Sequence, residues 1–209
     1  MGTGWQNRPY VPWSAMGVHA VFLVGFMASG KSSVGQELAR RLDWDFVDLD
    51  ARIEYRERQT IPEIFRDRGE PGFRLAETSA LRDLLTEPLQ RNRVVALGGG
   101  AFVQEMNREL LRQWPSVFLE ATAAELWRRS LTDGVERPLR EGPKQFAKLY
   151  AERLPFYRQA SLVIETTGKQ LGSICVEIEG ALQLKGTPED AGPGSSPIDL
   201  TGFGRGESH

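Results

Sequence analysis

The sequence contains few of the residues on which several common kinds of site depend. Among 209 residues there is one cysteine, Cys175, so no disulfide can form within the chain, which fits a reducing compartment. The apolar neighbours of Cys175 predict a buried structural thiol. The only histidines are His19, beside an apolar run, and His209, at the end of the sequence. The sequence therefore has almost none of the residues that a zinc site or a histidine-based catalytic triad needs.

Neither sign of charge dominates the chain. There are 26 Lys and Arg residues against 28 Asp and Glu residues, a formal net charge of -2. Without a basic surplus we expect neither nucleic acid nor an anionic membrane as a partner. The apolar stretch at 18–28 is too short to span a bilayer, and no Lys/Arg-rich segment precedes it as in a signal peptide. We therefore expect a soluble cytoplasmic protein.

The ends of the chain differ in composition from its middle. Residues 1–17 are rich in Gly and Pro, and residues 185–209 in Gly, Pro, Ser and acids, so we expect a loose arm and a disordered tail. The remaining residues, 18–184, are sufficient for one globular domain, since the chain is 40% hydrophobic.

Within that domain, short β-rich runs alternate with longer segments of helical periodicity. The runs are AVFLVG, DFVD, VVALG, SVFLEA and LVIET. Residues 32–42 predict the first helix, with apolar side chains on one stripe, and residues 60–69 predict a helix that begins with a capping box and ends at Gly69. Alternation of this kind favours a parallel sheet with helices on both faces.

The segment GFMASGKSS, residues 25–33, follows the first predicted strand and opens the first predicted helix. It fits the phosphate-binding pattern G-x-x-x-x-G-K-[ST]. In such a loop, backbone N–H groups surround phosphate oxygens, the lysine reaches the β- and γ-phosphates, and the serine ligates Mg²⁺. A simple glycine turn would account for Gly25 and Gly30, but not for Lys31 next to Ser32. The sequence therefore predicts a nucleotide site, without choosing between kinase, ATPase and GTPase.

Two aspartates, Asp48 and Asp50, follow the second predicted strand. Both are expected at the carboxyl edge of the sheet, where open α/β folds bind ligands. Asp48 could hold Mg²⁺ through water, and Asp50 could accept a hydrogen bond from a substrate hydroxyl. The alternative for Asp50 is a helix-capping role, which is common for an aspartate after a strand.

A run of three glycines follows the third predicted strand, and several arginines lie beside Gly, Pro or aromatic residues. The glycines are Gly98, Gly99 and Gly100, and the arginines are Arg74, Arg137 and Arg158. Glycines allow a ligand to approach the backbone closely, although a flexible turn would use them too. Planar guanidinium groups suit carboxylates or phosphates, although any single arginine could simply be solvated.

Taken together, GFMASGKSSVG, DFVDLD, IFRDRGEPGFRLAE, VVALGGGA, ERPL and LPFYRQA resemble shikimate kinase in order and spacing over about residues 20–184. The resemblance implies a P-loop kinase of the nucleoside-monophosphate-kinase type, with a five-stranded parallel sheet of order 2-3-1-4-5 flanked by helices. It also implies a substrate-binding segment at about 50–80 and a lid at about 131–144. The implied reaction transfers the γ-phosphoryl group of ATP, with Mg²⁺, to the 3-hydroxyl of shikimate in aromatic amino-acid biosynthesis.

The resemblance also implies roles for individual residues. Catalytic roles fall to Lys31, Asp50 and Arg137. Substrate binding falls to Asp50, Arg74, Gly98, Gly99, Gly100 and Arg158, with Arg74 and Arg158 on the carboxylate and Glu77 orienting Arg74. Nucleotide binding falls to Ala28, Ser29, Gly30, Lys31, Ser32, Ser33, Arg129 and Arg137, with Arg129 near the adenine and Arg137 on the lid. The metal would be held by Ser32 and, through water, by Asp48.

The chain departs from the family pattern at three places. Ala28 stands where the family often has glycine, a change that the loop should tolerate if φ there is negative. Arg140 replaces a usual leucine, and the segment after the last strand lacks a proline that often borders the adenine. Two alternatives stay open: a related kinase for gluconate or another polyol acid, and an ATP-binding regulatory domain without turnover. We expect a monomer that binds shikimate and ATP.

Overall fold

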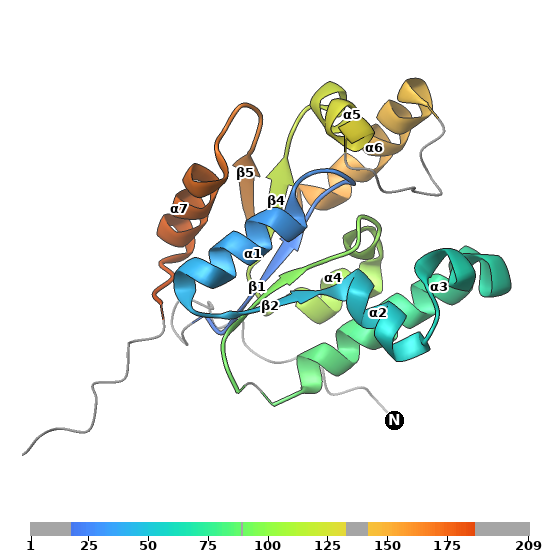
Figure 1. Ribbon diagram of the computed structural model, residues 1–209, viewed down its shortest axis with the longest axis horizontal. Helices are drawn as coiled ribbons and strands as arrows, with labels where there is room; N and C mark the ends of the chain where they lie inside the picture. Colours follow the sequence, from blue (N-terminus) through green and yellow to red (C-terminus); the bar gives the residue numbers. More distant parts are fainter. Residues whose placement is uncertain (1–17, 89, 133–141, 187–209) are drawn as a thin grey trace, which may run out of the picture.

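A five-stranded parallel sheet forms the centre of the computed structural model, in the order β2-β3-β1-β4-β5 (Figure 1). The strands are β1 (Ala20–Val24), β2 (Asp45–Asp48), β3 (Arg93–Ala96), β4 (Ser116–Glu120) and β5 (Leu162–Glu165). The structure describes residues 18–88, 90–132 and 142–186. The expected arm at 1–17, the tail from 187 onward and the central part of the expected lid, 133–141, lie outside these residues. The strand order confirms the fold class that the resemblance implied.

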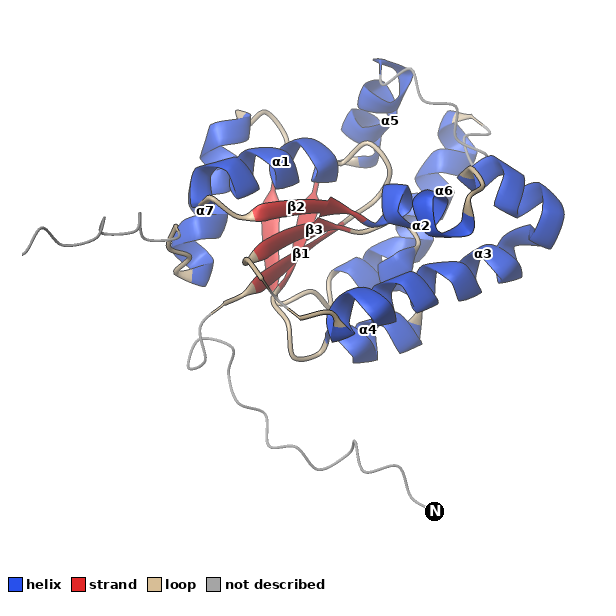
Figure 2. Ribbon diagram, turned by 60° about the horizontal axis from the view of Figure 1, so that its bottom comes forward, coloured by secondary structure: helices blue, strands red, loops and turns tan. Residues whose placement is uncertain are grey.

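Helices cover both faces of the sheet (Figures 1 and 2). They are α1 (Lys31–Leu42), α2 (Leu49–Glu57), α3 (Ile61–Thr86), α4 (Glu105–Leu111), α5 (Ala123–Thr132), α6 (Pro143–Tyr157) and α7 (Leu171–Leu182), with a 3₁₀ turn η2 (Ala101–Val103) before α4. The central strand β1 is buried on both faces: Phe22 and Val24 pack on the side of α2 to α6, and Val21 and Leu23 pack on the side of α1 and α7. This two-sided burial is why β1 is a continuous apolar run.

The helix α1 follows the predicted pattern, because Val34, Leu38 and Leu42 are all buried against the sheet. Cys175 on α7 packs on the same side, with its Sγ atom 3.8 Å from the carbonyl oxygen of Val34. Burial raises the pKa of this thiol to about 11, which keeps it protonated at neutral pH. Its environment is that of a structural thiol, as predicted.

The helix α3 consists of two helical halves that meet at Gly69. The first half begins with the predicted capping box, in which Thr60 and Glu63 each bond to the other's backbone. Gly69 has φ 65° and ψ -178°, which interrupts the helical path, and a second half then runs to Thr86. The prediction that the helix ends at Gly69 is therefore correct for the first half. Figure 2 shows α2 and this first half beyond the carboxyl ends of β2 and β3.

Across the ranges that the structure describes, no helix has both the length and the apolar character needed to cross a membrane.

Candidate active site

The loop after β1 wraps around its own lysine. The Nζ atom of Lys31 donates to the carbonyl oxygens of Phe26 (2.8 Å) and Gly25 (3.1 Å). Gly30, at the N-terminus of α1, has φ 90°, a conformation that side chains rarely tolerate. A glycine turn leading into the start of α1 is the arrangement that a phosphate-binding loop uses to present its backbone N–H groups.

Ala28 differs from what the sequence led us to expect. We expected this position to tolerate alanine if its φ were negative, but its φ is 59°. This conformation is left-handed, where the Cβ of an L-residue crowds the following carbonyl, at a cost of roughly 1–2 kcal/mol. The condition for easy tolerance is therefore not met, and the loop carries local strain at Ala28.

The two residues expected to hold Mg²⁺ join the start of α1 to the end of β2. The Oγ atom of Ser32 donates to Oδ2 of Asp48 at 2.9 Å. The other carboxylate oxygen of Asp48 accepts from the backbone N–H of Asp50 at 3.0 Å, so Asp48 also caps α2. The capping role that we considered for Asp50 thus belongs to Asp48, and Asp50 lies in the first turn of α2.

This pair fits a magnesium ion held together with a nucleotide. In the described part of the chain, no three His, Cys, Asp or Glu side chains form a group that could hold a metal. Mg²⁺ characteristically takes one or two protein oxygens and completes its shell with water and substrate phosphates. The hydroxyl of Ser32, with Asp48 behind it, offers that donor set next to the phosphate loop.

Gly98, Gly99 and Gly100, which follow β3, form a surface that we call the glycine floor. Acidic and basic side chains of the site pack against it. A Cβ atom at Gly98 would lie 2.6 Å from Oδ1 of Asp50 and 2.9 Å from Oε1 of Glu77. A Cβ atom at Gly100 would lie 2.4 Å from Nη2 of Arg74. Real Cβ atoms essentially never make contacts this short, so a side chain at either position would displace the groups that it meets. The two outer glycines are what allow these three side chains to approach the backbone.

Arg74 is held at two places by carboxylates on its own helix. Its Nη1 atom donates to Oε2 of Glu77 at 2.9 Å, and its Nε and Nη2 atoms donate to Oε1 of Glu70 at 3.2 and 3.0 Å. The Glu77 side chain is fully buried, whereas the Glu70 side chain is 54% exposed. Burial raises the pKa of Glu77, while the contact with Arg74 lowers it. The expected orientation of Arg74 by Glu77 is present as an ion pair.

A second arginine, Arg153, approaches Arg74 from α6. Both line a cavity of about 420 Å³ beside Gly100 and Gln104. The Nη1 atom of Arg153 donates to the carbonyl oxygen of Gly99 at 3.4 Å, and its guanidinium lies 5.7 Å from the ring centre of Phe26. The cavity therefore has two guanidinium groups. Arg74 lies against Gly100, and Arg153 contacts both Gly99 and Phe26 of the phosphate loop.

Arg158, expected to bind the carboxylate together with Arg74, does not line the cavity that Arg74 and Arg153 share. Arg158 immediately follows α6, its side chain is 59% exposed, and its Nη2 atom bonds to Oε1 of Glu120 at 2.8 Å. Bonding to Glu120 raises the pKa of Arg158. The sequence did carry a signal for Arg153, because it falls in the helical stripe 146, 150, 153, 157, whose other members are all buried. Arg158 falls outside that stripe.

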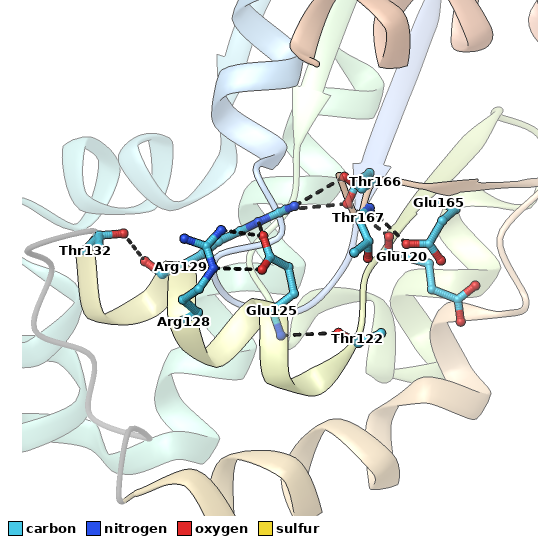
Figure 3. Close-up of polar contacts among 9 residues, drawn as sticks. All are labelled: Glu120, Thr122, Glu125, Arg128, Arg129, Thr132, Glu165, Thr166 and Thr167. Carbon is cyan, nitrogen blue, oxygen red and sulfur yellow. Dashed lines mark hydrogen bonds and ion pairs between the residues drawn. The ribbon is translucent and has the colours of Figure 1, made fainter. Parts of the chain in front are cut away.

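Arg129 reaches from α5 to the chain after β5 (Figure 3). Its Nε atom donates to Oε1 of Glu125 at 2.8 Å, and its Nη2 atom donates to the carbonyl oxygen of Thr166 at 3.2 Å. Hydrogen bonds from Arg128 and Arg129 lower the pKa of Glu125 to about 2. Arg129 is thus fixed beside the segment after the last strand, the segment that lacks the proline often found next to the adenine. Arg137, expected on the lid, lies outside the described residues.

Comparison with known proteins decides the family. A sequence model described as shikimate kinase matches residues 27–183, about three quarters of the chain. The chain belongs to the shikimate kinase family. The shikimate kinase of Geobacter metallireducens is 44% identical over 170 residues, covering 79% of this chain and 93% of that protein. The shikimate kinase of Rhodopseudomonas palustris is 42% identical, covering 72% of this chain and 74% of that protein.

Solved structures agree with this membership. A shikimate kinase from Acinetobacter baumannii in complex with shikimate is 35% identical, with a TM-score of 0.72 over 81% of this chain and 97% of that chain. The shikimate kinase of Bacteroides thetaiotaomicron is 32% identical, with a TM-score of 0.71 over 79% and 98%. A gluconokinase from Sinorhizobium meliloti, 20% identical with a TM-score of 0.53 over 78% and 91%, shares the fold alone. The resemblance drawn from the sequence is confirmed, and the chain is a kinase.

Proposed function

We propose that this protein transfers the γ-phosphoryl group of ATP to the 3-hydroxyl of shikimate, in the biosynthesis of aromatic amino acids. The observation that carries the proposal is the meeting of Arg74 and Arg153 in one cavity beside the glycine floor. Two guanidinium groups suit a substrate with a carboxylate, because each presents a planar pair of donors. Arg74 is already paired with Glu77 and Glu70, and Arg153 bonds to a backbone carbonyl, so a neutral polyol would add no ion pair to either guanidinium.

The glycine floor also joins this cavity to the phosphate loop. A Cβ atom at Gly99 would lie 3.5 Å from the backbone nitrogen of Met27 and 3.8 Å from the carbonyl oxygen of Gly25. A substrate lying on the floor is therefore close to the loop that holds the phosphates. Catalysis then comes mainly from holding the two reactants in line and from positive charge around the transferred group.

In this mechanism each residue has a separate task. Lys31 holds the β- and γ-phosphates, and Ser32, with Asp48 behind it, holds the Mg²⁺ that neutralises phosphate charge. Asp50 accepts a hydrogen bond from the attacking hydroxyl, whose oxygen bonds to the γ-phosphorus as the bond to ADP breaks. Arg74 and Arg153 hold the carboxylate, and the glycines Gly98, Gly99 and Gly100 leave room for the ring. The proposal includes three further roles. Arg137 binds the phosphates, Arg129 lies near the adenine, and the nucleotide is surrounded by Ala28, Ser29, Gly30 and Ser33.

The proposal includes a monomer in the cytoplasm, where ATP is available, with no nucleic-acid or membrane partner. The net charge of only -2 supports the absence of a nucleic-acid or anionic-membrane partner.

Release of ADP, measured with a panel of acceptors, tests the proposal. We expect shikimate to support rapid release, with gluconate and nucleoside monophosphates far slower. Preference for gluconate would favour a polyol-acid kinase, and no release with any acceptor would favour a regulatory ATP-binding domain. A shikimate analogue with a neutral amide in place of the carboxylate sharpens the test. Wild type should discriminate strongly against it, and Arg74→Ala should barely distinguish acid from amide.

A further inference from the structure

The buried carboxylate of Glu77 has two hydrogen-bond donors, and only one of them is an arginine. Its Oε2 atom accepts from Nη1 of Arg74 at 2.9 Å and from Nε2 of Gln104 at 2.8 Å. Its Oε1 atom, at the glycine floor, has no hydrogen-bond partner within the described residues. A fully buried carboxylate with one bare oxygen depends strongly on the donors that remain.

Gln104 comes from a different part of the chain than the other groups of the site. It lies between η2 and α4, 27 residues from Glu77, and it lines the same cavity as Arg74 and Arg153. Its side chain is half-buried. No motif in the sequence points to it. Its amide is a neutral donor, so it stabilises the carboxylate without competing for the substrate's negative charge.

The charges around Glu77 make this donor important. From α2, Asp50 faces it across Gly98 with a like charge, and from its own helix Arg74 faces it with the opposite charge. Glu70 bonds the other edge of Arg74, and Arg153 on α6 lines the cavity beyond. Burial and Asp50 raise the pKa of Glu77, whereas Arg74 and the hydrogen bond from Gln104 lower it. Loss of the amide donor therefore moves Glu77 toward its neutral form, which holds Arg74 less firmly.

We propose that Gln104 is a positioning residue of the carboxylate-binding site: it holds Glu77 in place, and through Glu77 it fixes the guanidinium of Arg74. This inference rests on the proposed function, because the substrate's carboxylate is the group that Arg74 receives. The side-chain hydrogen bond of Gln104 goes to Glu77, so it acts through that carboxylate. Replacing Gln104 should therefore change KM for shikimate and the pH at which kcat/KM for shikimate falls on the acidic side.

The test compares Gln104→Met, which keeps the length and loses the donor, with Glu105→Gln, a neighbouring exposed substitution on α4 that serves as the control. In Gln104→Met we expect KM for shikimate to rise about three- to tenfold, with kcat and KM for ATP within about twofold. This is less than for direct loss of a hydrogen bond to a charged group, because Gln104 acts on the substrate only through Glu77 and Arg74. The acidic limb of kcat/KM should move to higher pH, since Glu77 then takes up its proton earlier. Glu105→Gln should match wild type in all of these.

A double-mutant cycle with Glu77→Gln separates positioning from general damage. Glu77→Gln leaves no carboxylate charge to pair with Arg74, so adding Gln104→Met to it should cost far less than Gln104→Met costs in wild type. The inference is overturned if a folded Gln104→Met protein keeps the wild-type KM and acidic limb. It is also overturned if KM for ATP rises equally, or if the two substitutions are fully additive.

A measurement without substrate keeps this inference separate from the proposed function. Carbon NMR of the Glu77 carboxyl should show a higher titration midpoint in Gln104→Met than in wild type. An unchanged midpoint contradicts the role of Gln104 whatever the substrate. If wild type fails to phosphorylate shikimate while the midpoint does shift, the proposed function falls, and the role of Gln104 in substrate binding falls with it.

Discussion

The guanidinium of Arg74 lies directly against the backbone of Gly100. A Cβ atom at that position would come within 2.4 Å of Nη2 and 2.5 Å of Nη1. The atoms in conflict are the end of a long side chain, so Gly100→Ala should fold and should displace the guanidinium instead. Because small displacements in a binding site are costly, we expect kcat/KM for shikimate to fall about tenfold or more, with ATP binding little changed.

Gly180→Ala, on the exposed face of α7 and away from the site, is the matched control for this prediction. A Cβ atom there meets no other atom within 4 Å. We expect this variant to stay within about threefold of wild type. Steady-state kinetics on the two variants make the comparison, and equal losses in both would contradict the steric explanation.

Arg153 and Arg158 provide a second pair of substitutions. Arg153→Ala removes one of two guanidinium groups from the cavity, so kcat/KM for shikimate should fall about ten- to a hundredfold. Arg158→Ala removes an exposed partner of Glu120, and we expect little change, because exposed ion pairs contribute little. Kinetics at saturating ATP decide between them. A larger loss in Arg158→Ala would return the carboxylate-binding role to that residue.

Lys31→Ala should leave the fold intact and remove the charge that meets the transferred phosphoryl group. Loss of one electrostatic stabiliser of the transition state typically costs a hundredfold or more, so kcat should fall at least about a hundredfold. Lys148→Ala is the control, because this lysine on α6 is 79% exposed. Near-normal turnover in a folded Lys31→Ala protein would refute the assignment of the phosphate loop.

Arg74→Lys tests whether charge alone is enough at the carboxylate. Lysine keeps the charge but lacks the planar pair of donors, and it cannot bond both Glu77 and Glu70 in the same way. Losing a hydrogen bond to a charged group costs roughly 1.5–3 kcal/mol, so kcat/KM for shikimate should fall about ten- to a hundredfold. The Kd for ATP, measured by calorimetry, should change little; a matching loss there would point to a general distortion.

Ala28→Gly should stabilise the protein. The left-handed backbone at φ 59° is strained for alanine and free for glycine, so we expect a gain of about 1 kcal/mol in the free energy of unfolding. For a domain of this size the gain corresponds to about 2–4 °C in Tm. Ala147→Gly, on the exposed face of α6, should instead lose about 1 kcal/mol, because glycine disfavours helix. Thermal unfolding of both variants is the measurement, and a lower Tm in Ala28→Gly would contradict the inferred strain.

Features contained in one continuous segment could be predicted from the sequence. The phosphate loop is a strand, a turn and a helix in direct succession, and the capping box at Thr60 and Glu63 spans three residues. In such segments the spacing of glycine, lysine and hydroxyl groups already determines which atoms meet, because the backbone between them has few conformations. The strand order was available only through the resemblance to a family, since periodicity does not say which strands are neighbours.

Contacts between distant segments were decided by the tertiary structure. The side of α6 that packs against the glycine floor selects Arg153 over Arg158, and this choice depends on the burial of the whole stripe that includes Tyr150 and Tyr157. Gln104 reaches Glu77 only because η2 and α4 pack beside α3. A sequence states which side chains are present, but long-range packing chooses the faces that meet, because that choice minimises exposed apolar area over the whole core.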